Sequence, residues 1–134
     1  MIDQIEFEEG IYDGEMKDGV RHGVGKYNFL DGERYEGEWV DGLMHGTGIY
    51  YESDSGKYIG SFYENERTGH GTYYDCDGGK YYGNFRGGER HGKGTQTDYW
   101  GVKYTGQWRE DERNGKGVET YPNGERYEGF WKND

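Results

Sequence analysis

The chain has 134 residues, of which 30% are hydrophobic and 18% aromatic, and it carries a formal net charge of −11. The apolar share lies below the roughly 45–50% of an ordinary globular domain, which argues against a closed two-layer core, while the many aromatic residues argue against disorder. An acidic surface repels phosphate backbones, so the charge argues against a nucleic-acid partner and favours a cationic protein or peptide.

No targeting signal or membrane span is visible along the chain. The first residues lack a basic stretch followed by an apolar run, and no stretch approaches 18 consecutive apolar residues. The single cysteine, Cys76, cannot form an intramolecular disulfide and fits a reducing compartment. We therefore expect a cytoplasmic protein.

Residues 1–11 precede a regular repeat. Within them, Ile2, Ile5 and Phe7 predict a short strand, which we expect to cap the array formed by residues 12–134. From residue 12 onward, the motif Tyr-x-Gly recurs every 23 residues without an insertion. The tyrosines that open the units are Tyr12, Tyr35, Tyr58, Tyr81, Tyr104 and Tyr127.

Other columns of residues share the phase of these tyrosines. With each opening tyrosine counted as position 1, position 3 is always glycine, and positions 12 and 14 are glycine in all five complete units. Position 5 holds Trp or Phe in every unit but the first, where it is Met16, and position 23 is always basic. Position 16 is tyrosine in three units, followed by Gln96 and Glu119. Columns in one phase over the whole array indicate a repeat architecture.

Each unit predicts a β-hairpin. Alternation favours strands at positions 1–7 and 12–18, and glycine-containing polar stretches favour connections at positions 8–11 and 19–23. Because side chains alternate between faces, this spacing sets position 5 opposite position 14 and position 3 opposite position 16, so that each position-5 ring lies over a glycine. We expect an all-β fold: an elongated, single-layer, twisted antiparallel meander of about a dozen strands, with one aromatic face and no closed core.

The segments "YEGEWVDGLMHGTG", "YYGNFRGGERHGKG" and "YTGQWREDERNGKG" resemble MORN repeats, in which Tyr-x-Gly-x-Trp/Phe is followed by a glycine and then by His-Gly-x-Gly. The resemblance covers the chain from Tyr12 onward, as five full repeats and the start of a sixth. The departures from this pattern are mild. Met16 replaces the aromatic residue, Asn65 and Asp111 replace the mid-unit glycine, and Thr68 and Asn114 replace the histidine.

What this resemblance implies is a non-catalytic scaffold or protein-interaction module. MORN arrays act as scaffolds at cytoskeletal or membrane-associated structures, including ciliary and flagellar spokes, and they are often associated with phospholipids. They also occur beside catalytic domains in some enzymes. Two alternatives to a protein-binding scaffold therefore stay open: a phosphoinositide-binding module that tethers the protein to a membrane, and the targeting region of a larger enzyme.

The aromatic face is the best candidate for partner binding, because a single-layer sheet leaves one side of each ring uncovered. The opposing interpretation is that the rings cover one another and serve only folding. We expect the aromatic middle units to bind most strongly, and Tyr99 and Trp100, in one connection, to form a local contact. The residues expected to touch a protein segment are Tyr35, Trp39, Tyr50, Tyr58, Phe62, Tyr73, Tyr81, Phe85 and Trp108.

Basic residues form further columns along the expected edges of the sheet. They either balance neighbouring acidic residues or contact acidic lipid headgroups, and a net charge of −11 matches an anionic bilayer poorly. The residues expected to contact headgroups in the lipid alternative are Arg67, Arg90, Arg113, Lys80 and Lys103.

No catalytic, metal or cofactor site is expected. His22, His45 and His91 recur at position 11, but at the spacing of the units they stand too far apart to share a metal ion, so we expect them to cap turns. The stretch "DCDGG" (75–79) lacks the later ligands of a calcium loop and is expected to form a turn. Its acidic residues surround Cys76 and disfavour the thiolate.

The sixth unit begins with Tyr127, Gly129 and Trp131, and no second strand of that unit follows in the sequence. A strand here would have an open edge with unpaired backbone groups, which folded proteins normally protect. Either the array continues in a longer protein, or these three residues form the edge through which two copies pair. We expect a homodimer through the C-terminal units, since a closed two-fold contact is the commonest homo-oligomer and MORN arrays are similar in being reported as dimers.

Overall fold

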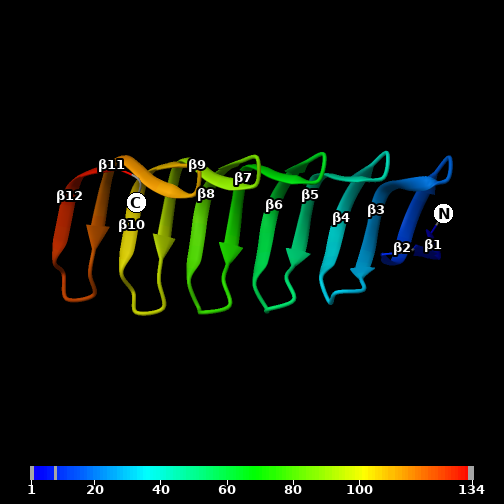
Figure 1. The fold of residues 1–134 in the computed structure, drawn as a ribbon, viewed down its shortest axis with the longest axis horizontal. Helices are drawn as coiled ribbons and strands as arrows, with labels where there is room; N and C mark the ends of the chain where they lie inside the picture. The colour runs from blue at the N-terminus through cyan, green and yellow to red at the C-terminus, as the bar shows by residue number, and fades with distance from the viewer. Residues whose placement is uncertain (1, 8, 133–134) are drawn as a thin grey trace.

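The computed structural model describes residues 2–7 and 9–132, and these form one open sheet of 12 antiparallel strands. Each strand pairs with its neighbours in sequence, from β1 to β12, as Figure 1 shows. The all-β, single-layer meander predicted from the sequence is therefore confirmed. Since the described residues form no helix, none of them belongs to a helix long and apolar enough to cross a membrane.

The strands repeat with the period of the sequence. β1 (Ile2–Phe7) pairs with β2 ahead of the array. Residues 1 and 8 of the predicted capping segment, and residues 133 and 134 of the predicted array, lie outside the described residues. The strands of the array are β2 (Gly10–Lys17), β3 (Val20–Phe29), β4 (Arg34–Val40), β5 (Leu43–Tyr51), β6 (Lys57–Tyr63), β7 (Glu66–Tyr74), β8 (Lys80–Arg86), β9 (Glu89–Thr97), β10 (Lys103–Arg109), β11 (Glu112–Thr120) and β12 (Arg126–Trp131).

The two strands of each unit are joined by a turn of only two residues, at positions 7 and 8. Both residues have positive φ, for example 50° at Asp41 and 85° at Gly42, and 45° at Glu64 and 75° at Asn65. Such turns match the right-handed twist of the strands they join. The predicted four-residue connection at positions 8–11 is therefore wrong, because the second strand already begins at position 9.

The register of the hairpins differs from the predicted one by two residues. Gly37, at position 3, lies opposite Gly48, at position 14, while Tyr35 lies opposite Tyr50. The expected pairing of position 3 with position 16 is wrong. The predicted face of each residue holds, however, because a shift of two residues leaves every side chain on the same side of the sheet.

A bulge in each hairpin explains the glycine at position 12. In the second unit the pairing jumps from Gly37 opposite Gly48 to Trp39 opposite Met44, so three residues of β5 lie opposite one residue of β4. Gly46, one of those three, has a φ of 94°, in the left-handed region that side chains disfavour. This glycine therefore serves the backbone of the bulge rather than making room for a ring.

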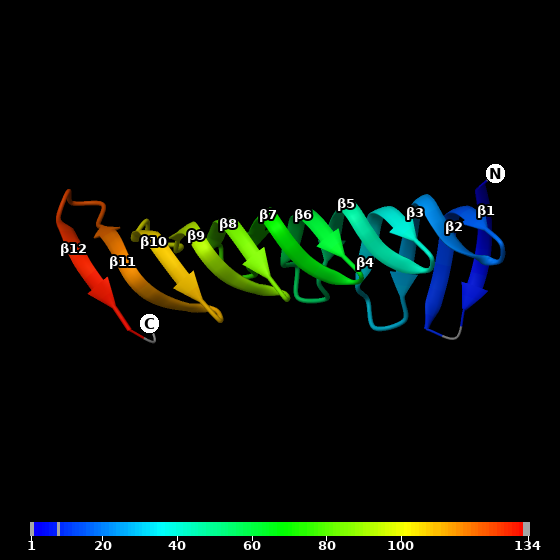
Figure 2. The same ribbon diagram turned by 90° about the horizontal axis from the view of Figure 1, so that it is seen from above.

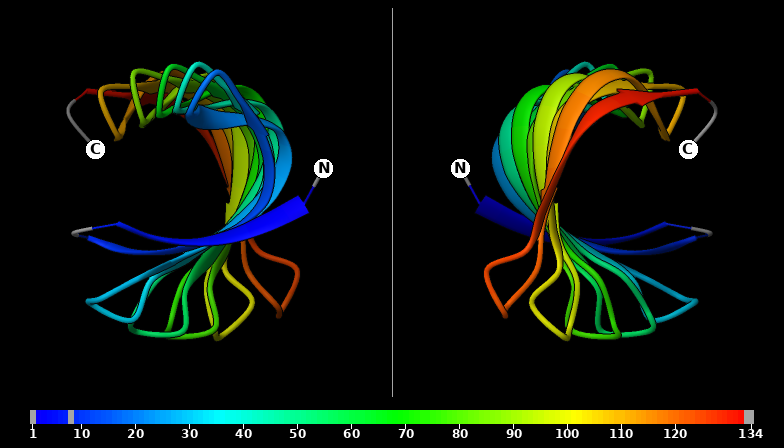
Figure 3. Two further views of the ribbon diagram at one scale, coloured as in Figure 1. Left: turned by 90° about the vertical axis from the view of Figure 1, so that its right-hand side faces the viewer. Right: turned by 90° about the vertical axis from the view of Figure 1, so that its left-hand side faces the viewer.

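The array is an elongated, twisted rod (Figure 2). All two-residue turns lie along one edge and all longer connections along the other (Figure 1). Seen down the long axis in Figure 3, the strands bend so that the edge with the two-residue turns arches over one side of the sheet. The bend matters for function because it decides which side chains of a single-layer sheet are covered.

Candidate interaction surface

The tyrosine that opens each unit lies over a row of glycines. Positions 3 and 14 face each other across the sheet, and a Cβ added to Gly48 would lie 2.3 Å from the hydroxyl oxygen of Tyr35. That hydroxyl donates a 2.8 Å hydrogen bond to the carbonyl oxygen of Glu38, beside the bulge. The ring thus occupies the space that a side chain at position 14 would need. The same hydrogen bond is made by Tyr12, Tyr58, Tyr81 and Tyr104.

Rings of positions 1 and 5 alternate along the array in one continuous stack, which we call the ring ladder. Trp39 stands edge-on between Tyr12 and Tyr35, with centroid distances of 5.6 and 5.0 Å. Its indole nitrogen donates a 3.1 Å hydrogen bond to the carbonyl oxygen of Gly25. Each edge-to-face pair contributes about 0.5–1.5 kcal/mol beyond burial, so the ladder is the core of the fold. In order it contains Tyr12, Trp39, Tyr35, Phe62, Tyr58, Phe85, Tyr81, Trp108, Tyr104, Trp131 and Tyr127.

Burial of the ring ladder changes where a partner can bind. The premise that one side of each ring is uncovered is wrong, because neighbouring rings and arginine side chains cover it. Two of the expected contact residues, Tyr50 and Tyr73, are half-buried and pack against the ladder. They still offer ring surface to a partner, so the predicted contact now depends on these two residues. The other expected contact residues are ladder members no more than 5% exposed: Tyr35, Trp39, Tyr58, Phe62, Tyr81, Phe85 and Trp108.

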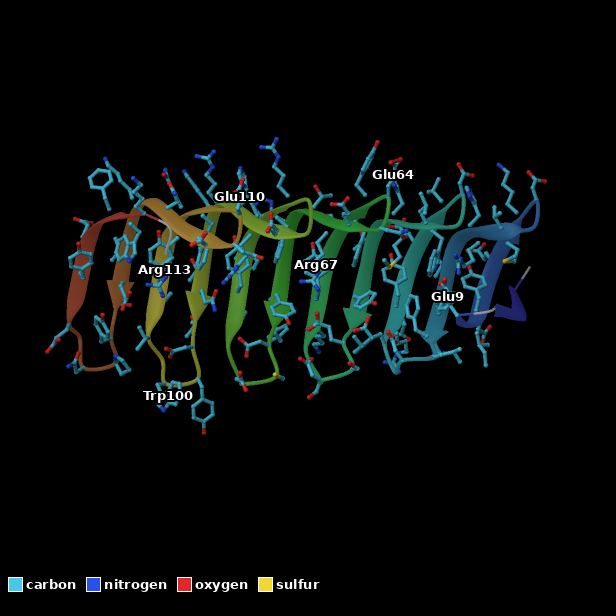
Figure 4. The ribbon with its side chains drawn as sticks, viewed as in Figure 1. Glu9, Glu64, Arg67, Trp100, Glu110 and Arg113 are labelled. Atoms are coloured by element: carbon cyan, nitrogen blue, oxygen red, sulfur yellow. The ribbon has the colours of Figure 1, made fainter. Side chains whose placement is uncertain are left out.

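Arginines of position 10 lie over the rings on this side of the sheet, which we call the ring face (Figure 4). The guanidinium carbon of Arg90 is 4.5 Å from the ring centroid of Trp108, and that of Arg113 is 4.6 Å from that of Tyr104. Such contacts stabilise by about 0.5–1 kcal/mol, and by more when desolvated. Sequence reasoning placed these arginines along the edges. The signal that could have placed them correctly is their even position, because even positions of the second strand lie on the same face of the sheet as the rings at positions 1 and 5.

Three arginines of the ring face are also ion-paired. Three of the five residues expected to contact lipid headgroups already have a carboxylate partner, whereas Lys80 and Lys103 are exposed and form no ion pair within the described residues. A headgroup would have to displace those carboxylates. The pairs and their N–O distances are Arg67 with Glu52 at 3.0 Å, Arg90 with Asp111 at 3.0 Å, and Arg113 with Glu119 at 2.6 Å.

A hollow of about 380 Å³ opens on the ring face between the third and fourth units. Tyr73 lies at its side and donates a hydrogen bond from its hydroxyl to the carboxylate of Glu52. Burial, together with this hydrogen bond, raises the pKa of Tyr73, so the hydroxyl stays protonated and remains a donor at neutral pH. The hollow combines ring surface with paired charges. Its lining includes Arg67, Tyr73, Tyr81, Phe85, Arg90 and Gln96.

The longer connections are ordered by their own acidic residues. Asp75 Oδ1 accepts hydrogen bonds of 2.9 and 2.8 Å from the amides of Asp77 and Gly79, so the "DCDGG" stretch is a turn. Cys76 is exposed in this turn. Desolvation, followed by the nearby carboxylates of Asp77 and Asp54, raises the pKa of the Cys76 thiol, which keeps it protonated.

Two of the three histidines of position 11 contact the turn of the next unit, as predicted for a turn cap, and the capping role of His91 stays a prediction. Nδ1 of His22 accepts a 3.4 Å hydrogen bond from the amide of Asp41, and Nδ1 of His45 accepts one of 3.4 Å from the amide of Glu64. Over residues 2–7 and 9–132, no group of three or more His, Cys, Asp or Glu side chains is placed to hold a metal ion.

The extra rings of the fourth connection form a local contact. Tyr99 and Trp100 meet edge to face with centroids 5.5 Å apart and are 71% and 76% exposed. Tyr99 also lies against the preceding connection, where its Cδ2 would be 2.9 Å from a Cβ on Gly78. Figure 4 shows Trp100 at the edge of the sheet that carries the longer connections, away from the ring ladder.

The sixth unit extends the ladder by two rings. Trp131 contacts Tyr104 at 4.9 Å and Tyr127 at 5.1 Å, and Gly129 lies opposite Gly117. β12 pairs with β11 and with no further strand among the described residues. Pairing of this edge with a second copy stays a prediction.

Comparison with known families agrees with this geometry. The model of the MORN repeat family matches residues 12–34, 35–56, 58–80, 81–103 and 104–126. Each match begins at the opening tyrosine of a unit and ends at the last residue before the next unit, except that the second match stops one residue short and leaves out residue 57. A comparison with curated proteins finds no match.

Proposed function

Since the chain belongs to the MORN repeat family, whose repeats are commonly protein- or lipid-interaction modules, we propose that it is a non-catalytic scaffold that binds a protein segment along its ring face. The observation that carries this proposal is the hollow between the third and fourth units, which half-buried Tyr73 lines together with Arg67 and Arg90. Grooves that combine aromatic surface with a few placed polar groups are typical peptide-binding sites.

The charge around the hollow favours a basic or amphipathic segment as the occupant. Glu52 and Asp111 neutralise the two arginines of the hollow, whereas Asp54, Asp75 and Asp77 of the adjoining connections form no ion pair within the described residues and leave the surroundings of the hollow negative. With a net charge of −11, the chain attracts a cationic segment over a long range, and the carboxylates then fix its position. The apolar side of such a segment would cover the exposed parts of the position-16 rings.

The position-16 column supports binding at the middle units. Tyr50 and Tyr73 offer half-buried rings there, whereas Gln96 and Glu119 in the same column accept hydrogen bonds from arginines of their own units. Polar side chains that are already paired present less apolar surface to a partner, so affinity should decline toward the C-terminal units.

Capture from a cell extract by the immobilised chain, followed by mass spectrometry, tests the proposal. Tyr73→Ala removes the ring at the hollow, and Tyr63→Ala is the matched control because it removes a 57% exposed ring from the opposite face. Partners of the ring face should be lost with Tyr73→Ala and retained with Tyr63→Ala, while circular dichroism shows both variants folded. Retention of every captured protein by folded Tyr73→Ala would refute the assignment of the surface.

Two alternatives are separated from the scaffold by other measurements. A phosphoinositide-binding tether would make the chain sediment with vesicles that contain phosphoinositide and not with vesicles that lack it. The targeting region of a larger enzyme would be revealed by a native reading frame that continues into a catalytic domain. The likeness to MORN arrays supports a cytoskeletal or membrane-associated assembly as the place of action, which fluorescence microscopy of the tagged protein would test.

A further inference from the structure

The face opposite the ring ladder carries a second groove, over the C-terminal half of the array. It has a volume of about 1030 Å³ and reaches from β7 to β12. Backbone of the glycine row contributes to its lining, as at Gly94 and Gly106. Side chains of positions 4 and 13 border the glycines on one side, among them Lys93 and Lys116. Side chains of positions 2 and 15, such as Tyr82, border them on the other.

The charge of this face changes sign along the array. Its N-terminal half holds carboxylates at positions 2 and 4 of the first two units, whereas the groove holds neutral side chains at those positions in the fourth and fifth units. Lys93 and Lys116 are exposed and form no ion pair within the described residues. The one carboxylate of the groove, Glu128, is already paired with Arg126 at 2.9 Å. The carboxylates of the N-terminal half are Asp13, Glu15, Glu36 and Glu38.

The groove also offers hydrogen bonds and apolar surface. Thr95 and Thr105 lie side by side with their hydroxyl oxygens 3.2 Å apart, and the amide of Gln107 stands beside Lys93 across the strand pair. Tyr82 and Phe130 are 58% and 73% exposed, so their rings are accessible to a partner. Rings, amides and unpaired ammonium groups together form a surface that an extended peptide can use along its whole length.

We propose that this groove binds an extended acidic peptide in polyproline-II conformation, with a carboxylate at every third residue. Lys93 and Lys116 occupy the same position in successive units, two strands apart, so they are separated by roughly 9–10 Å at ordinary strand spacing. A polyproline-II helix has three residues per turn and rises about 3.1 Å per residue, so every third side chain returns to one side after about 9.3 Å. The two periods match, and each lysine meets one carboxylate.

The remaining groups of the groove fit the same occupant. A polyproline-II segment has no internal hydrogen bonds, so its backbone groups are free to bond with Asn84, Gln107 and the threonines. Its apolar residues can pack on exposed rings such as Tyr82, as proline-rich segments do in aromatic grooves. A nucleic acid is a poorer occupant, because a duplex carries one phosphate charge per about 1.7 Å of its axis, whereas the two lysines of the groove stand roughly 9–10 Å apart and would leave most phosphates unpaired.

Fluorescence anisotropy with a labelled peptide of four Glu-Pro-Pro triplets tests this proposal. The peptide should bind saturably, more weakly at high salt, and at least about tenfold more tightly than a peptide of the same composition with its glutamates adjacent. Lys93→Glu combined with Lys116→Glu should lower the affinity at least about tenfold. The matched control, Lys17→Glu combined with Lys57→Glu, changes the net charge equally outside the groove and should retain the affinity.

Other results would overturn the proposal. Equal affinity for both peptides would show that the spacing of the carboxylates does not matter. Equal losses of affinity in the two double variants would reveal a general charge effect. A third contrary result would be self-association that Lys93→Glu with Lys116→Glu abolishes while the peptide does not bind, because the occupant would then be the acidic half of a second copy. Tyr73→Ala should bind the peptide normally, which keeps this groove separate from the ring-face proposal.

Discussion

Gly48→Ala should strongly destabilise the array, although it adds a single methyl group. The added Cβ would lie 2.3 Å from the hydroxyl oxygen of Tyr35, 2.4 Å from Cε1 and 2.5 Å from Cζ. Tyr35 is 0% exposed, so its ring has no free space to enter. Either the ring leaves its place over the glycine row or the two strands separate.

The cost follows from what the ring of Tyr35 would lose. Overpacking of a tight site costs about 1–3 kcal/mol. A displaced ring also weakens the hydrogen bond from its hydroxyl to Glu38, worth about 0.5–1.5 kcal/mol, and its 5.0 Å edge-to-face contacts with Trp39 and Phe62, worth about 0.5–1.5 kcal/mol each. Because relaxation relieves part of the clash, we expect the free energy of unfolding to fall by about 2–4 kcal/mol.

Urea denaturation followed by circular dichroism measures this loss, and hydrogen exchange locates it in β4, β5 and β6. Thr47→Ala is the control, because Thr47 is exposed on the opposite face and its replacement should cost less than about 1 kcal/mol. In a Tyr35→Ala background, Gly48→Ala should add little further loss, since the clash is gone. Equal losses for Gly48→Ala and Thr47→Ala, or full additivity with Tyr35→Ala, would refute the assigned packing.

Three further predictions concern the ring face, the tyrosines and the C-terminal edge. Arg90→Ala should lower the free energy of unfolding by about 1–2 kcal/mol in urea titrations, because its guanidinium is ion-paired and lies over a ladder ring. Exposed Arg109 is the control, and Arg109→Ala should cost less than about 0.5 kcal/mol; equal costs would contradict the ring contact. Burial raises the pKa of Tyr58 and Tyr81 from 10.0 to about 12, so their contribution to stability is fully present below pH 10 and is lost as the pH rises toward 12. The tyrosinate absorbance of these two residues, obtained by difference from Tyr58→Phe combined with Tyr81→Phe, should rise together with the loss of circular dichroism; ionisation of the two while the sheet stays folded would contradict their burial. Light scattering should give a dimer mass for the chain and a monomer mass for a chain shortened to end at Asn123, and monomers for both would exclude the dimer.

The sequence by itself determined the hairpin repeat and the face of each residue within the predicted strands. Tyr35 and Trp39, at positions 1 and 5 of the 23-residue unit, must lie on the same face of the sheet, because side chains alternate between faces along a strand. Low apolar content and aromatic residues paired with glycines indicated a single layer rather than a closed core. These conclusions depend on composition and parity, which do not change when two strands slide by two residues.

Only the tertiary structure decided the register, the bulge and the burial of the rings. Registers that differ by two residues keep the same face, so parity cannot separate them; the left-handed φ of Gly46 and the contact of Tyr35 with Gly48 do. The candidate site changed for the same reason. Arg90 and Tyr81 cover the ring of Trp108 from the preceding unit, and such contacts depend on neighbouring units that no local pattern describes.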